Sequence, residues 1–180
     1  MVFLAPWREH QSRQCNVYRG QTLEKNKSKV RENLDRYVHY LTRYRQHSQS
    51  LDLESKLISL TEKKEDVLAA AKTCSHTIRL ALKKAVEVLH QCRRTLKYSY
   101  AFAYYLYQNN QAEVFEQNQA DLERATEALS GFLENEIDAE QNISATLMNK
   151  THYCDHRYRI LLDHCKEGYM QHYWAGLDEY

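Results

Sequence analysis

The chain has 180 residues, enough for one domain with a buried core, and four glycines and one proline are too few for the turns of a β-sandwich or βαβ units. Its 25 Lys and Arg nearly balance its 24 Asp and Glu, which excludes a strongly basic field for nucleic acid. No apolar run approaches the ~20 residues that span a bilayer, so no membrane partner is expected either. Long amphipathic helices fit this composition best.

Residues 1–20 are predicted to be irregular. They contain His10 and Cys15, residue types that bind zinc, but a structural zinc site needs four ligands and only two stand here. We therefore expect no complete metal site and no cofactor. The opening lacks the features of a secretory signal, and the five cysteines form an odd number without a CxxC pair. Reduced thiols and a location in the cytoplasm or nucleus are expected.

Two helices are predicted in the first part of the chain, over 22–49 and 51–72. Ser50 can cap backbone N–H groups, so a break is expected between them. The apolar positions of the first helix follow helical spacing: Val30, Leu34, Tyr37, Val38, Leu41 and Tyr44.

Three longer helices are predicted after these, over 77–107, 111–136 and 139–173. The first has an apolar line at Leu82, Val86, Leu89, Arg93 and Leu96, followed by a tyrosine-rich run and a polar break at 108–111. The second has the line Phe115, Asn118, Leu122, Ala125, Leu129 and Phe132. Gly131 interrupts that helix, and close packing against a neighbour would explain it. The third has a seam with seven-residue steps: Ile143, Leu147, Thr151, Cys154, Tyr158, Leu161, Cys165 and Tyr169.

Few residues indicate catalytic or metal chemistry. The chain has no glycine-rich phosphate loop and no Gly-x-Ser-x-Gly motif. His152 and His156 share a helix face, but Cys154 between them fits the apolar seam, and two histidines rarely make a metal site. Glu54, Glu116 and Glu127 each stand beside an apolar line. They are either ordinary solvated charges or parts of one patch that faces a partner.

Several long motifs carry a family resemblance. They are LKKAVEVL at 82–89, QCRRTL at 91–96, YSYAFAYYL at 98–106, NQADLE at 118–123 and ATEALSG at 125–131. This stretch closely resembles the C-terminal domain of Ariadne-type RING-between-RING ubiquitin ligases. Residues 1–20 look like the closing segment of the RING2 domain of these ligases, with His10 and Cys15 at its last two zinc ligands. The resemblance implies a RING2 remnant at 1–20 and an all-α, extended bundle of about five long helices at 21–180.

The resemblance also implies a function. In these ligases a ubiquitin-conjugating enzyme passes ubiquitin to a RING2 cysteine. The Ariadne domain packs on RING2 and inhibits it until a neddylated cullin–RING ligase binds. The residues of this chain that correspond to the RING2-facing surface are Leu53, Glu54, Glu116 and Glu127, with Leu53 in place of the family's phenylalanine.

The RING2 catalytic cysteine has no counterpart here, so the chain itself is expected not to be an enzyme. Zinc would be a cofactor only of a complete RING2. Two alternatives stay open: the chain is the C-terminal part of a ubiquitin transferase whose catalytic modules lie outside it, or it is a plain helical scaffold.

Overall fold

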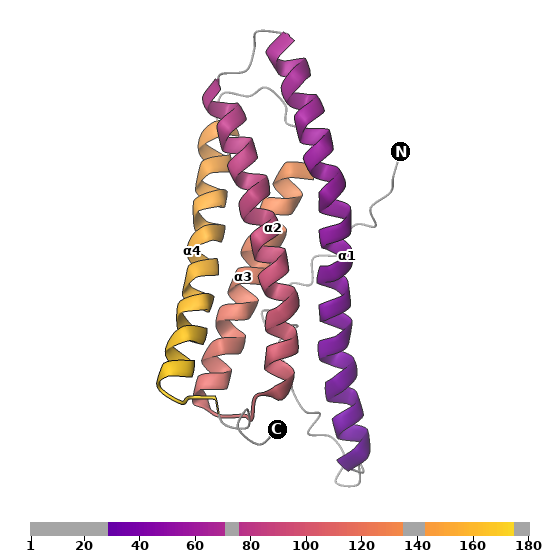
Figure 1. The fold of residues 1–180 in the computed structure, drawn as a ribbon, viewed down its shortest axis with the longest axis vertical. Coiled ribbons are helices and arrows are strands. Elements are labelled where there is room, and N and C mark those ends of the chain that lie inside the picture. Colours follow the sequence, from indigo (N-terminus) through magenta and orange to yellow (C-terminus); the bar gives the residue numbers. More distant parts are fainter. Residues whose placement is uncertain (1–28, 71–75, 135–142, 175–180) are drawn as a thin grey trace.

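A computed structural model describes residues 29–70, 76–134 and 143–174, which form four helices and, within these ranges, no strand. They are α1 (Lys29–Ala70), α2 (His76–Tyr105), α3 (Asn110–Glu134) and α4 (Ile143–Met170). Figure 1 shows an elongated up-down-up-down arrangement, in which α1 and α3 run opposite to α2 and α4. The predicted all-α class is confirmed. Within the described ranges, no helix is long and apolar enough to cross a membrane.

The prediction of two separate helices before residue 72 is wrong, because α1 continues through Ser48 and Ser50. Neither proline nor glycine occurs anywhere in α1, so nothing in the backbone forces a break. A serine cap contributes only about 1 kcal/mol, less than the packing of a continuous helix along α2. The bundle therefore has four long helices where five were expected.

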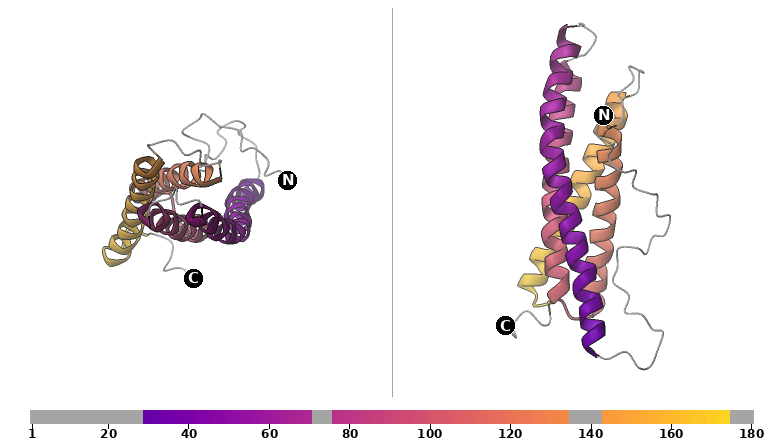
Figure 2. Two further views of the ribbon diagram at one scale, coloured as in Figure 1. Left: turned by 90° about the horizontal axis from the view of Figure 1, so that it is seen from above. Right: turned by 90° about the vertical axis from the view of Figure 1, so that its right-hand side faces the viewer.

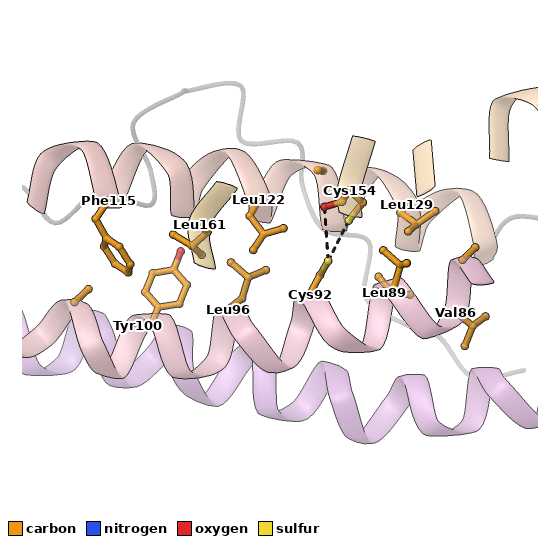
Figure 3. Packing of buried hydrophobic residues seen from close by; sticks show 14 of the residues in the cluster. Val86, Leu89, Cys92, Leu96, Tyr100, Phe115, Leu122, Leu129, Cys154 and Leu161 are labelled. Atoms are coloured by element: carbon orange, nitrogen blue, oxygen red, sulfur yellow. Dashed lines mark hydrogen bonds between the residues drawn. The ribbon is translucent and has the colours of Figure 1, made fainter. Parts of the chain in front are cut away.

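The apolar core lies among α2, α3 and α4, which all pack on one another. Figure 3 shows the side chains of α2 facing those of α3, with Cys154 and Leu161 of α4 completing the cluster. The predicted lines on α2 and α3 are confirmed at the following buried positions: Leu82, Val86, Leu89, Leu96, Phe115, Leu122, Ala125 and Leu129. Sequence spacing thus located this core.

On α4 the seam is correct at Leu147, Thr151, Cys154 and Leu161, which are buried, but Tyr169 is exposed. Trp174 fills the end of the core instead. Its ring lies 5.4 Å from that of Phe102 and 5.8 Å from that of Phe115, centroid to centroid, and its Nε1 donates to the Cys165 carbonyl. A Cβ on Gly168 would come within 2.1 Å of this ring, so glycine is needed there. By contrast, the close packing expected at Gly131 is absent, since a Cβ there would meet nothing within 4 Å.

The break between α2 and α3 falls where the polar run predicted it. The Asn109 side-chain oxygen caps α3 by accepting the backbone N–H of Ala112 at 2.8 Å. Arg36 of α1 caps the C-terminal end of α2. Its guanidinium donates to the carbonyls of Tyr104 and Leu106 at 3.0 and 2.6 Å. These contacts satisfy carbonyls that have no partner within their own helix.

Helix α1 packs along α2, and in Figure 2 it lies at the opposite side of the molecule from α4. The apolar line predicted for it is wrong as a core: Val30, Leu34, Tyr37 and Val38 are 47–76% exposed. Among residues 29–54 of α1, whose side chains the structure describes, the buried ones are Tyr40, His47 and Glu54. A second, polar interface therefore exists between α1 and the rest of the bundle.

Candidate docking surface

The side chains that link α1 to α3 are polar and lie in three layers, which we call the polar seam. Tyr40, His47 and Glu54 recur every seven residues, which keeps them on one face of α1. Opposite them lie Glu116, Glu123 and Glu127 of α3, and α2 contributes Arg93 and Tyr100.

The first layer joins Tyr40 to Glu116. The tyrosine hydroxyl donates to Glu116 Oε1 at 2.8 Å, and both residues are buried. Burial raises the pKa of Glu116 above its usual value, and the Tyr40 hydrogen bond opposes that rise. The hydroxyl therefore stabilises a carboxylate that has little access to water.

The second layer surrounds Glu123. The Tyr100 hydroxyl donates to Glu123 Oε2 at 2.7 Å, and His47 Nε2 lies 3.4 Å from Oε1. The His47 and Tyr100 rings stack, with centroids 5.5 Å apart and planes 12° from parallel. Burial alone would raise the pKa of Glu123, but the hydrogen bonds and charge of its neighbours, His47 foremost, outweigh burial and hold it below its usual value.

The third layer is an ion-paired triad around Arg93. The guanidinium Nε donates to Glu54 Oε1 at 2.7 Å, and its two terminal nitrogens bind both oxygens of Glu127, Nη2 at 3.2 Å. Such two-pronged pairing fixes the orientation of both groups. Arg93 is 3% exposed and Glu54 6%, whereas the side chain of Glu127 is 35% exposed.

The two carboxylates of this triad differ in electrostatic state. Burial raises the pKa of Glu54 to about 7, although the charge and hydrogen bond of Arg93 lower it. Burial would lower the pKa of Arg93, but its contacts with Glu127 and Glu54 outweigh that effect, so it stays protonated. The buried Arg93 is thus paired with two carboxylates. Glu127 reaches water, whereas Glu54 is buried and has a pKa of about 7.

The four residues expected on a RING2-facing surface have different environments. Leu53 is 42% exposed, beside Glu54 in the chain. Glu54 and Glu127 are brought together by Arg93, whereas Glu116 lies on the same side of α3 but about 16 Å further along its axis. The expectation that Glu54 and Glu116 are exposed is wrong, since each carboxylate is buried against a donor from another helix.

The sequence interpretation missed the partners of these carboxylates: Arg93, Tyr40, His47, Tyr100 and Glu123. Two signals could have found some of them. Arg93 stands inside an apolar line between Leu89 and Leu96, where a charge must be paired. Tyr40, His47 and Glu54 repeat with a coiled-coil period, but their polarity concealed it.

The metal-ligand candidates lie partly inside and partly outside the described residues. His152 and His156 are exposed on α4, while Cys154 is buried and faces Cys92. Across 29–70, 76–134 and 143–174, no three His, Cys, Asp or Glu residues gather to hold a metal ion. His10 and Cys15 lie outside the described residues.

The described residues thus form an elongated helical bundle that carries a partly exposed, ion-paired patch. The Ariadne domain model matches residues 35–156, and the chain belongs to this family. It is 42% identical over 185 residues to "E3 ubiquitin-protein ligase ARIH1" of Homo sapiens, covering 99% of this chain and 33% of that protein. It is 41% identical over 180 residues to "E3 ubiquitin-protein ligase ariadne-1" of Drosophila melanogaster, covering 96% and 36%.

The chain therefore spans about a third of the length of the curated relatives it matches. Those relatives are E3 ubiquitin ligases as whole proteins, and the matched part is a domain associated with such ligases.

Proposed function

We propose that this domain packs on the catalytic RING2 domain of a RING-between-RING ubiquitin ligase and holds it inactive until a neddylated cullin–RING ligase binds. The observation that carries the proposal is the Arg93 triad, which fixes a half-exposed Glu127 carboxylate next to the turn that presents Leu53. An oriented carboxylate and an exposed apolar side chain are suitable contacts for a zinc domain that offers a basic and an apolar group.

The four residues divide into two roles in this proposal. Leu53 and Glu127 make the contact with RING2, because they are the members that reach solvent. Glu54 and Glu116 are positioning residues. Glu54 holds Arg93, which orients Glu127, and Glu116 holds α1 through Tyr40.

A binding titration tests the contact. The probe is the zinc-loaded RING2 domain of human ARIH1, a relative 42% identical to this chain over the matched region. Glu127→Ala and Leu53→Ala are each expected to weaken its binding about tenfold, as centrally placed interface residues do. Wild-type affinity in both variants would contradict the proposed surface.

Matched controls lie on other helices. Glu167→Ala removes an exposed carboxylate from α4, and Leu80→Ala removes an exposed leucine from α2. Both are expected to bind RING2 as the wild type does. A loss in the controls equal to that in Glu127→Ala would indicate a nonspecific effect of charge or apolar area.

Relief of inhibition is tested by competition. A neddylated cullin–RING ligase added to the preformed complex is expected to release RING2, whereas the unmodified cullin complex is expected to leave it bound. Release by both forms to the same extent would contradict the activation step, even if the RING2 contact itself is verified.

The chain is proposed to carry out no ubiquitin transfer itself, which takes place on RING2 with a ubiquitin-conjugating enzyme in the cytoplasm or nucleus. Incubation with a ubiquitin-charged conjugating enzyme is expected to give no thioester on this chain. A ubiquitin adduct that reducing agent removes would assign it a catalytic cysteine.

A further inference from the structure

Two cysteines from different helices meet inside the three-helix core. Cys92 of α2 and Cys154 of α4 are 62 positions apart in the chain, yet their sulfur atoms lie 3.4 Å apart. Both residues are fully buried, and Figure 3 shows them facing each other across the core. The Thr126 hydroxyl of α3 lies 3.8 Å from the Cys154 sulfur, so a third helix contributes a polar group to the pair.

We propose that Cys92 and Cys154 are an oxidative modification site, at which a small hydroperoxide produces a disulfide between α2 and α4. A disulfide bond is about 2.05 Å long, so the two sulfurs need to approach by roughly 1.4 Å in total. Side-chain rotation supplies a movement of this size without separating the helices. The site does not depend on the proposed RING2 contact.

The environment distinguishes the two thiols. The hydrogen bond that Cys154 shares with Cys92 lowers the pKa of Cys154 and, with a smaller contribution from Thr126, outweighs burial. Hydrogen bonding to Cys154 and burial raise the pKa of Cys92. The Cys154 sulfur also has a second polar neighbour, the Thr126 hydroxyl at 3.8 Å, so Cys154 is assigned as the thiol that reacts first and Cys92 as the resolving thiol.

The reaction balances with hydrogen peroxide as the two-electron oxidant. The Cys154 thiolate attacks one peroxide oxygen and breaks the O–O bond, which gives a sulfenic acid and a hydroxide that becomes water on protonation. The Cys92 sulfur then attacks the sulfenic sulfur, so that the S–S bond forms and the S–O bond breaks. The departing hydroxide takes the Cys92 proton, and a second water leaves.

A surface hollow lies beside the segments that carry Thr126 and Cys154, without reaching either sulfur. Its volume is about 350 Å³, and it is lined by Ala125 and Tyr153, the chain neighbours of Thr126 and Cys154. Since both thiols are fully buried, the reaction is expected to be slow and limited to small oxidants.

Cys165 provides an internal comparison on the same helix. It is half-buried, and burial raises the pKa of its thiol to about 11. No described residue places a second thiol beside it. If solvent exposure alone decided which thiol is oxidised, Cys165 would react before Cys154. If a neighbouring thiol decides, Cys154 reacts first.

The experiment uses the full chain with Cys15→Ser, Cys74→Ser and Cys165→Ser, which leaves only the core pair. After treatment with hydrogen peroxide and alkylation, mass spectrometry without reductant is expected to show a loss of two hydrogens and a peptide linking Cys92 to Cys154. Closing a long loop is expected to raise Tm by about 5 °C or more, reversibly with dithiothreitol.

Adding Cys92→Ser to this background keeps Cys154 and removes the resolving thiol. The variant is expected to show neither the crosslink nor the Tm shift, and dimedone added during denaturation is expected to trap a sulfenic acid on Cys154. Two free thiols in the unsubstituted pair after prolonged incubation of the folded chain with excess hydrogen peroxide would overturn the proposal. So would a disulfide that joins separate chains.

Discussion

The molecule contains two interfaces of opposite chemistry along the same helix, α2. One side of α2 contributes Leu89, Leu96 and Cys92 to the apolar core with α3 and α4. Arg93 and Tyr100 stand on the same helical line as Leu89 and Leu96, but their polar ends reach the polar seam between α1 and α3. The apolar core gains stability from area buried, which depends little on direction, whereas the seam depends on the geometry of individual hydrogen bonds and ion pairs.

This difference indicates where the molecule is adjustable. A buried ion pair adds little net stability, because desolvation offsets the attraction, yet removing one partner is costly. The seam therefore defines where α1 lies, because its hydrogen bonds and ion pairs form in only one geometry. It adds little net free energy of stabilisation to that position. It also contains Glu54, Glu116 and Glu127 of the proposed docking surface, and Leu53 precedes Glu54 in the chain.

The largest effect is expected in the apolar core. Leu129→Ala removes a fully buried side chain and is expected to lower the free energy of unfolding by about 3–4 kcal/mol. Leu34→Ala on α1 makes the same change at an exposed position and is expected to cost less than about 0.5 kcal/mol. Urea denaturation of both variants measures the difference. Similar losses would mean that the exposed line of α1 is buried in solution.

A somewhat smaller effect is expected when the seam loses its cation. Arg93→Met leaves Glu54 and Glu127 without their shared partner and is expected to cost about 2–3 kcal/mol at pH 7. Glu54 avoids part of the penalty by taking up a proton, so the loss is expected to shrink at pH 5.5. Arg94→Met, an exposed neighbour, is the control and is expected to change stability little. A pH-independent loss in Arg93→Met would contradict the role assigned to Glu54.

The same contrast explains what the sequence predicted and what it did not. Helices α2, α3 and α4 were predicted almost to their ends, because Leu82, Leu122 and their companions follow helical spacing with apolar side chains. In residues 29–54 of α1, Val30, Leu34, Tyr37 and Val38 are exposed, and the buried side chains, those of Tyr40, His47 and Glu54, carry polar groups. Periodicity of hydrophobic residues therefore indicated the wrong face there.

The candidate site was predictable only in part. Family resemblance identified Leu53, Glu54, Glu116 and Glu127 as a set, but it gave no indication of burial. Whether a glutamate is buried depends on a donor from a distant part of the chain. Tyr40 is 76 positions from Glu116, and Arg93 is 39 positions from Glu54. Such pairs become visible only once the helices are placed.

The raised pKa of Glu54 makes stability depend on pH. Its pKa is about 7 in the folded chain, against an ordinary value of 4.5, so the folded chain binds the proton more tightly than the unfolded chain does. This contribution to stability is therefore present at low pH and is lost as the pH rises through about 7. From pH 6 to pH 8 the free energy of unfolding is expected to fall by about 1 kcal/mol through this group.

Glu54→Gln isolates the effect, since histidines also titrate in this range. The difference between wild type and variant is expected to change by about 1 kcal/mol between pH 6 and pH 8. Burial raises the pKa of Glu116 as well, so that residue adds a change of the same sign to both proteins. The lowered pKa of Glu123 acts below its ordinary value and stays outside this window. A constant difference across the range would show that Glu54 is ionised throughout.

The smallest effect is expected where the seam loses one neutral donor. Tyr40→Phe keeps the ring against Tyr104 but removes the hydroxyl that donates to Glu116, and is expected to cost about 1 kcal/mol at pH 8. Without that donor the pKa of Glu116 rises further, so protonation is expected to reduce the cost at pH 5.5. Tyr37→Phe, three positions earlier in the same helix at a residue that is 47% exposed, is expected to have no effect at either pH. If Tyr40→Phe costs the same at both pH values, the hydroxyl is not holding a carboxylate, and the first layer of the seam is stabilised by ring packing alone.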